Sequence, residues 1–139
     1  MTSKQINQDY LLRFEKGELL VDSFLKFVKQ HSIRPAWLSG LGAALWAEIG
    51  YYDLQNQQYR FKKIERELEI GSLTGNLTWT DAQPAVHLHI VVADSSLQAF
   101  SGHLKELAVG GTCEIFLKTF DQAIGRKQDA GSGLNLLDL

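Results

Sequence analysis

The hydrophobic period of this chain changes at Pro35, and that change constrains its fold more than any other feature of the sequence. Ahead of Pro35, one apolar stripe repeats at the spacing of an amphipathic helix and predicts a helix over 18–31. The stripe consists of Leu20, Phe24, Phe27 and Val28. Beyond Pro35, runs rich in β-branched and aromatic residues alternate with polar or glycine turns, as they do in strands. The chain therefore combines one main helix with many strands.

The strand positions follow from these runs and from the turns between them. One strand is expected ahead of the helix at Tyr10–Phe14, and the others near 36–39, 44–53, 58–63, 66–70, 73–80, 85–93, 98–104 and 112–119. We expect a short helix or turn over Leu104–Ala108, before a break at Gly110 and Gly111. The predicted fold class is α+β, with one main helix packed on a largely antiparallel, curled β-sheet.

The length of the chain fits one domain, 1–139, that can bury a core without covalent staples. We expect the packed core at about residues 10–120. Residues 1–9 are expected to form a loose polar arm, and residues 121–139 an irregular, glycine-containing tail. Three apolar side chains would hold that tail down: Leu134, Leu136 and Leu137.

The charge balance argues against direct nucleic-acid binding. Fourteen Lys and Arg residues against 16 Asp and Glu residues give a formal net charge of -2. The densest basic cluster is Arg60, Lys62, Lys63 and Arg66, and Glu65, Glu67 and Glu69 interrupt it. Duplex binders rely on a continuous basic stripe to neutralise phosphates. We therefore assign no nucleic-acid-binding residues.

The cysteine content and the apolar runs indicate a reducing compartment and no membrane partner. Cys113 is the single cysteine, so no disulfide can form within the chain, and its apolar surroundings favour a core position. The first ten residues lack the apolar stretch of a signal peptide. The apolar runs are far too short to span a bilayer. We expect a cytoplasmic protein.

Three of the four histidines lie within seventeen residues and can converge on one point. In Val86–Val92 the residues alternate, so His87 and His89 face opposite to Leu88 and Ile90. Their backbones would lie about 7 Å apart, and leaning rings could reach one zinc ion. By itself, His-x-His is a weak signal, because a histidine on a strand is more often an ordinary polar residue than a metal ligand.

The length of the loop after this strand decides whether His103 joins the pair. A three-residue loop centred on Ser96 sets His103 opposite His89 on the same face. A two-residue loop pairs it with Leu88 and turns it towards the core. In the first case three imidazoles converge and leave one position open, as in catalytic zinc sites.

Three charged residues could complete such a site. Glu69 and Glu114 each lie opposite apolar neighbours on their strands, where a carboxylate needs a partner if it is buried. For either residue alone, a solvent-facing position on an exposed sheet face is the more common case. The planar fork of Arg13 could hold a carboxylate or another anionic ligand, or it could form a surface ion pair.

Several segments together resemble the plants-and-prokaryotes-conserved (PPC) domain over about residues 10–120. They are Ser39–Ala43 with Gly50–Asp53, Glu69–Asn76, Pro84–His89 and Gly102–Leu104. The last two resemble the Pro-x-x-His-x-His and Gly-Gly-His-Leu motifs of that family, although Ser101 replaces the first glycine. Each segment is a weak signal alone, and their combination is specific.

The resemblance implies a homotrimer. It also implies the bacterial stand-alone type, because the AT-hook of plant members is missing. It also implies a fold relationship to α-acetolactate decarboxylase, a zinc enzyme whose metal is held by a similar His-x-His and a later histidine. His87, His89 and His103 then map as ligands of a divalent metal, zinc being the first choice. Glu69 and Glu114 match positions where the family carries acidic residues.

The sequence leaves two functions open. One is a small metalloprotein with lyase or hydrolase activity, in which Glu69 or Glu114 acts as acid or base and Arg13 holds an anionic substrate. The other is an oligomeric protein-interaction module with a structural metal or none. DNA binding, the label that bacterial relatives inherit from plant members, is the third choice. No nucleophile–base pair identifies a reaction, so the chain is not assigned as an enzyme.

Overall fold

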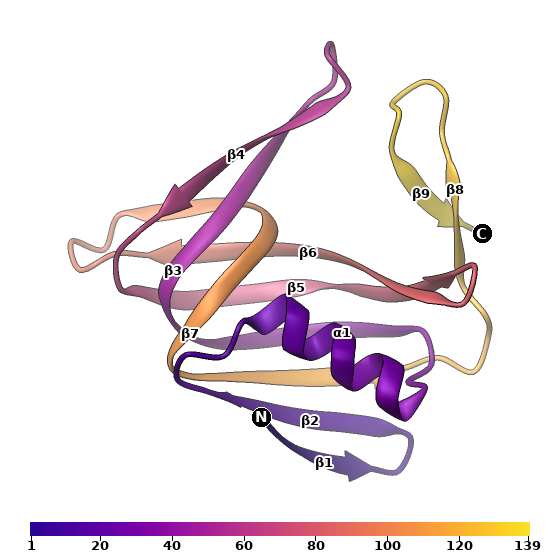
Figure 1. Ribbon diagram of the computed structural model, residues 1–139, viewed down its shortest axis with the longest axis horizontal. Helices are drawn as coiled ribbons and strands as arrows, with labels where there is room; N and C mark the ends of the chain where they lie inside the picture. Colours follow the sequence, from indigo (N-terminus) through magenta and orange to yellow (C-terminus); the bar gives the residue numbers. More distant parts are fainter.

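The computed structural model describes residues 1–139 and contains one helix and nine strands, drawn in Figure 1. In chain order they are β1 (Thr2–Ile6), β2 (Asp9–Glu15), α1 (Leu20–His31), β3 (Ala36–Asp53), β4 (Gln58–Ile64), β5 (Leu68–Thr80), β6 (Gln83–Ala93), β7 (Ala99–Thr119), β8 (Gly125–Gln128) and β9 (Asn135–Asp138). All strand pairs are antiparallel. The α+β prediction is therefore confirmed.

The main sheet curls because its long strands each pair along different parts with different neighbours. Its seven strands run in the order β1-β2-β7-β6-β5-β3-β4, and β3 additionally pairs with β7. One row of directly paired residues crosses most of this sheet: Leu11, Phe116, Ser39, Thr74, His89, His103 and Gly50. Directly paired residues share a face. The outward histidines thus lie on the same side of the sheet as Leu11 and Phe116.

Helix α1 covers the opposite face (Figure 1). Its buried residues are Leu20, Phe24, Phe27 and Val28, the stripe that predicted the helix. Its first turn has no side-chain cap of its own, and the carboxylate of Glu106 on β7 accepts hydrogen bonds from the backbone N–H groups of Val21 and Asp22 instead. Ser32 ends the helix in the left-handed conformation. No helix here has the length and apolar character needed to cross a membrane.

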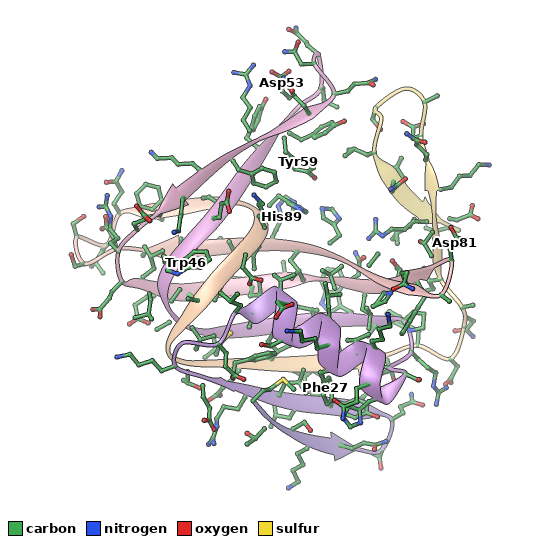
Figure 2. All side chains as sticks on the ribbon, in the orientation of Figure 1. Phe27, Trp46, Asp53, Tyr59, Asp81 and His89 are labelled. Carbon is green, nitrogen blue, oxygen red and sulfur yellow. The ribbon has the colours of Figure 1, made fainter.

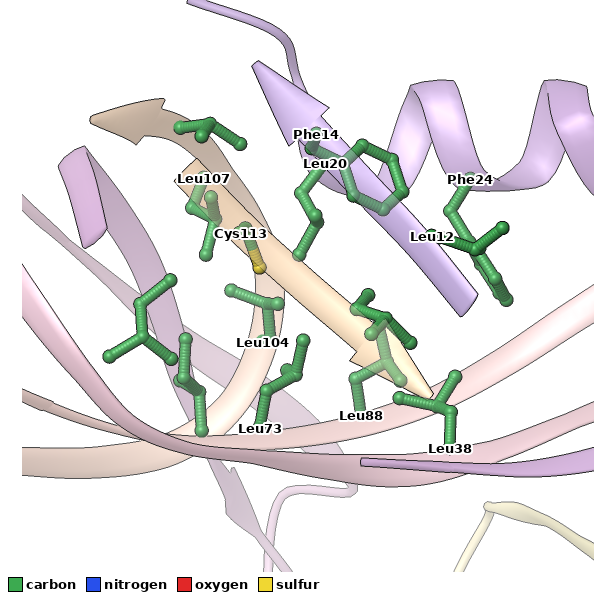
Figure 3. Packing of buried hydrophobic residues seen from close by; sticks show 14 of the residues in the cluster. Leu12, Phe14, Leu20, Phe24, Leu38, Leu73, Leu88, Leu104, Leu107 and Cys113 are labelled. Atoms are coloured by element: carbon green, nitrogen blue, oxygen red, sulfur yellow. The ribbon is translucent and has the colours of Figure 1, made fainter. Parts of the chain in front are cut away.

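The space between α1 and the sheet holds one core of 25 buried residues, part of which Figure 3 shows. Leu12, Phe14 and Phe24 meet Leu38 and Cys113 in it. Burial first, and then the charge of Glu114, raise the pKa of the Cys113 thiol to about 12. Cys113 is therefore a core residue, as predicted, and keeps its proton at physiological pH.

Three predicted interruptions are absent. The runs 36–39 and 44–53 form the single strand β3, with a bulge between Gly40 and Gly42, and 66–70 and 73–80 form β5. Likewise β7 is unbroken, so the helix or turn expected over Leu104–Ala108 is wrong. Gly110 does not break the strand: a Cβ there would lie 3.1 Å from the backbone of Ala44, so glycine permits β3 and β7 to cross closely.

Both chain ends are more ordered than predicted. The expected loose arm 1–9 contains β1, which pairs with β2 from Thr2↔Arg13 to Ile6↔Asp9. The expected irregular tail contains the β8–β9 hairpin, which stands apart from the main sheet in Figure 1. Leu136 and Leu137 are 47% and 40% exposed, so they hold the tail down less than expected. Hydrogen bonds between side chains, and from side chains to the backbone, attach the tail to the main sheet and the β3–β4 hairpin instead.

Candidate metal centre

Three histidines from two neighbouring strands converge on the outer face of the sheet. His89 on β6 pairs directly with His103 on β7, which is the geometry of the three-residue loop. His87 lies two residues ahead of His89 on the same face of β6, while Leu88 and Ile90 point into the core. One potential ligand atom of each ring lies within 4.8 Å of the others. The ring centroids are 5.1–5.8 Å apart.

Asp94 fixes the turn that produces this register. Its carboxylate Oδ1 accepts hydrogen bonds from the backbone N–H and the hydroxyl of Ser96 and from the backbone N–H of Gln98. Arg66 pairs with the other oxygen at 3.0 Å, and the Asp94 side chain is 4% exposed. These hydrogen bonds, and that of Ser96 above all, hold the pKa of Asp94 below its ordinary value. The turn therefore stays ordered around a charged carboxylate.

A glycine lies against the His87 backbone and lets β5 and β6 approach. Gly75 on β5 pairs with Leu88, and a Cβ at Gly75 would lie 2.0 Å from the carbonyl oxygen of His87. No side chain fits in that gap. The position of the His87 backbone therefore depends on a glycine in the neighbouring strand.

The surroundings of His103 suit a metal ligand. Its ring lies 4.6 Å from that of Tyr59 on β4 and 5.8 Å from that of His89, both labelled in Figure 2. Its Nδ1 atom is buried and has no hydrogen-bond partner. Burial first, and then His87 and His89, lower the pKa of His103 to about 4. A neutral ring with an unsatisfied nitrogen beside two more imidazoles is the donor set that zinc prefers.

The cluster opens into a hollow of about 710 Å³ between the β3–β4 hairpin, β6 and the β8–β9 hairpin. Its polar lining includes Tyr52, Tyr59, Asn76, His87, His103 and Arg126. Sequence reasoning missed Arg126, because it lies in a tail with no strand period long enough to predict a hairpin. Its neighbour Lys127 points away from the hollow, as alternation along β8 requires.

The other three predicted site residues lie elsewhere. Glu69 is exposed and lines a separate hollow with Gly110 and Gly111. Arg13 and Glu114 pair directly across β2 and β7 and line a third hollow. Arg13 also approaches Glu15 at 3.6 Å. Within one chain, none of the three lines the hollow of the histidines.

Comparison with known proteins finds the same architecture in several of them. The family model described as the Plants and Prokaryotes Conserved (PCC) domain matches residues 1–121. A structure from Bacteroides thetaiotaomicron, named a putative DNA-binding protein, is similar with 27% identity and a TM-score of 0.95, over 99% of this chain and 96% of that one. A structure of a metal-containing protein from Archaeoglobus fulgidus is 31% identical with a TM-score of 0.86, over 98% and 97% of the two chains.

Two further likenesses are narrower. The bifunctional protein GlmU of a Synechococcus strain is 29% identical over 127 residues, which are 89% of this chain. The chain spans about a fifth of the length of that curated relative. A Staphylococcus aureus protein similar to α-acetolactate decarboxylase has 10% identity and a TM-score of 0.57 over 87% of this chain. That likeness concerns the fold alone, and it agrees with the fold relationship expected from the sequence.

Proposed function

The chain belongs to the Plants and Prokaryotes Conserved (PCC) domain family, and from this premise we propose that it binds a divalent metal ion, zinc first, through His87, His89 and His103. The observation that carries the proposal is the convergence of three imidazoles whose ligand atoms lie within 4.8 Å of one another. The similar Archaeoglobus fulgidus protein, named for its metal, supports it.

The residues around the histidines would orient the ligands and leave one side open. The Tyr59 ring packs on His103, and the pairing of His89 with His103 fixes the distance between two ligands. Zinc held by three imidazoles keeps a position from which it can polarise a carbonyl or activate water. No carboxylate lines the hollow, so the lining itself offers no acid or base of the kind expected from Glu69 and Glu114.

Zinc analysis of purified protein tests this function. We expect about one zinc per chain in the wild type, and loss of most of it in His87→Ala and His103→Ala with the far-ultraviolet spectrum unchanged. His31→Ala is the matched control, because His31 is exposed on α1 and lies outside the cluster. Full zinc content in both cluster variants would refute the proposal.

We also propose that copies of the chain assemble through the sheet face opposite α1, as a homotrimer of the kind that the PPC resemblance implies. Large apolar side chains are exposed there: Leu11 44%, Trp37 48%, Leu41 57% and Phe116 44%. Phe116 pairs directly with both Leu11 and Ser39, so the exposed apolar residues are contiguous across β2, β7 and β3. Contiguous apolar surface of this kind marks interaction sites.

Charge pairing gives DNA binding less support than either proposal. In the basic cluster, Arg60 pairs with Asp53, Lys63 with Glu65, and Arg66 with Asp94. These carboxylates neutralise the groups that phosphates would need. The charges of this chain therefore do not support DNA binding of the kind for which the Bacteroides protein is named.

A further inference from the structure

Arg126 brings to the hollow a cation that has no acidic partner. The side chain rises from β8, and its Nε donates to the Thr78 hydroxyl. Its Nη1 donates to the carbonyl of Asn135, and its Nη2 donates to the Asn76 amide oxygen. All three acceptors are neutral, and no carboxylate lies within ion-pair distance or among the residues that line the hollow.

Part of the hydrogen-bonding capacity of Arg126 remains unused. A guanidinium has five N–H donors, and the three hydrogen bonds of Arg126 leave two of them free. The side chain is partly buried, and this burial lowers its pKa. A positioned, partly desolvated guanidinium with free donors matches the planar geometry of a carboxylate.

The guanidinium lies beside the candidate metal centre. Asn76, which accepts from Nη2, pairs directly with His87 across β5 and β6. Neighbouring strands are about 4.8 Å apart, so the residue that accepts from Nη2 lies one strand from His87. The hollow that both line, about 710 Å³, is within the range of small-ligand sites.

We infer that this hollow binds a small dicarboxylate, with one carboxylate on the free donors of Arg126 and the other directed at the metal position beside His87 and His103. The inference rests on the proposed metal site. Two positive centres in a hollow without acidic groups select a dianion by charge. Their short separation selects a chain of a few carbon atoms.

The test uses the full-length protein loaded with cobalt(II), whose visible absorption responds to a change of ligand at the metal. Metal content is measured first in every variant. Succinate and malonate are then titrated, with butyrate as a probe of succinate's length with one carboxylate fewer, and inorganic phosphate as a separate oxyanion. Arg126→Gln removes the charge, and Lys127→Gln removes the same charge from the outward side of the same hairpin.

We expect a dicarboxylate to shift the cobalt bands and to bind at least tenfold more tightly than butyrate. Arg126→Gln should weaken that binding at least tenfold, the smaller end of what a charge-assisted hydrogen bond contributes, while cobalt content and binding by Lys127→Gln stay within about twofold. Equal dicarboxylate affinity in wild type and Arg126→Gln overturns the inference. So does binding of phosphate without either dicarboxylate, or no binding of any probe by cobalt-loaded protein.

Cobalt content distinguishes failure of the proposed metal site from failure of the inference alone. Protein that takes up no cobalt refutes both, whereas cobalt-loaded protein that binds no dicarboxylate refutes only the inference. Arg126 also tethers the tail, so hydrogen exchange of residues 125–138 is followed in each variant. Arg126→Lys keeps the charge on the hairpin and should bind the dicarboxylate more tightly than Arg126→Gln. Equal losses in both variants, with equal loss of protection in the tail, overturn the inference and assign Arg126 to the tether alone.

Discussion

Protonation of His103 opposes folding of the metal-free protein, and the size of this effect follows from the structure. Burial, and then His87 and His89, lower its pKa from 6.5 to about 4. Between these values the unfolded chain binds more protons than the folded one, so stability is full above about pH 6.5 and falls as pH drops towards 4. The shift corresponds to about 3 kcal/mol. Because water still reaches the ring, screening reduces this to about 1–2 kcal/mol.

Urea unfolding in the presence of a chelator, followed by tryptophan fluorescence, measures this difference. The comparison is between the free energies of unfolding at about pH 7 and about pH 4.5, each measured in wild type and in His103→Asn. The wild type should lose about 1 kcal/mol more than the variant over this interval. The pKa values of Asp9 and Asp94 are lowered, chiefly by hydrogen bonds from Lys118 and Ser96, so these carboxylates remain charged in the folded state.

His31→Asn is the control for replacing a histidine, because His31 is exposed on α1. It should retain the full wild-type loss. Equal losses in wild type and His103→Asn would show that the His103 ring is not shielded as the structure indicates.

Three further outcomes are expected. Gly75→Val should cost about 3 kcal/mol or more in chemical unfolding, because its Cβ would meet the His87 carbonyl at 2.0 Å, whereas Gly71→Ala, with 3.9 Å of clearance, should cost under about 1 kcal/mol. Asp94→Ala should weaken zinc binding severalfold in competition with a chelator, because it releases the turn that sets the histidine register. Duplex DNA should show no mobility shift at sub-micromolar protein in moderate salt, and a salt-dependent shift would contradict the charge argument.

The histidine face was predictable because strand alternation leaves few choices, while the pairing of His103 was not. Alternation from Val86 to Val92 fixed the side on which His87 and His89 lie. The partner of His89 depended on the turn, and a change of one residue there would have turned His103 inwards. The information that decides it lies in Asp94, whose carboxylate binds two backbone N–H groups of the turn. An Asp-x-Ser sequence permits such a turn without requiring it.

The predicted strand break at Gly110 and Gly111 was wrong because Gly110 serves the close packing of two strands. Gly110 and Gly111 interrupt the apolar pattern, so a break in the strand was the reasonable interpretation. The long-range crossing of β3 over β7 leaves little room for a Cβ at Gly110, and no local pattern reveals that crossing. Arg126 was not predicted for a related reason, since its position depends on how the β8–β9 hairpin packs against the main sheet.

The exposed apolar residues and the candidate metal centre share one face, so the assembly proposed above would place a second copy close to the site. Trp37 pairs directly with Asn76, and Asn76 with His87, so Trp37 lies two strands, or about 10 Å, from a candidate ligand. A second copy packed on Trp37 would therefore border the hollow. Phe116→Lys, which introduces a charge into the same face away from the histidines, should dissociate the oligomer in sedimentation experiments. If its zinc content survives dissociation, one chain holds the metal by itself; if both are lost together, a neighbouring copy contributes to the site.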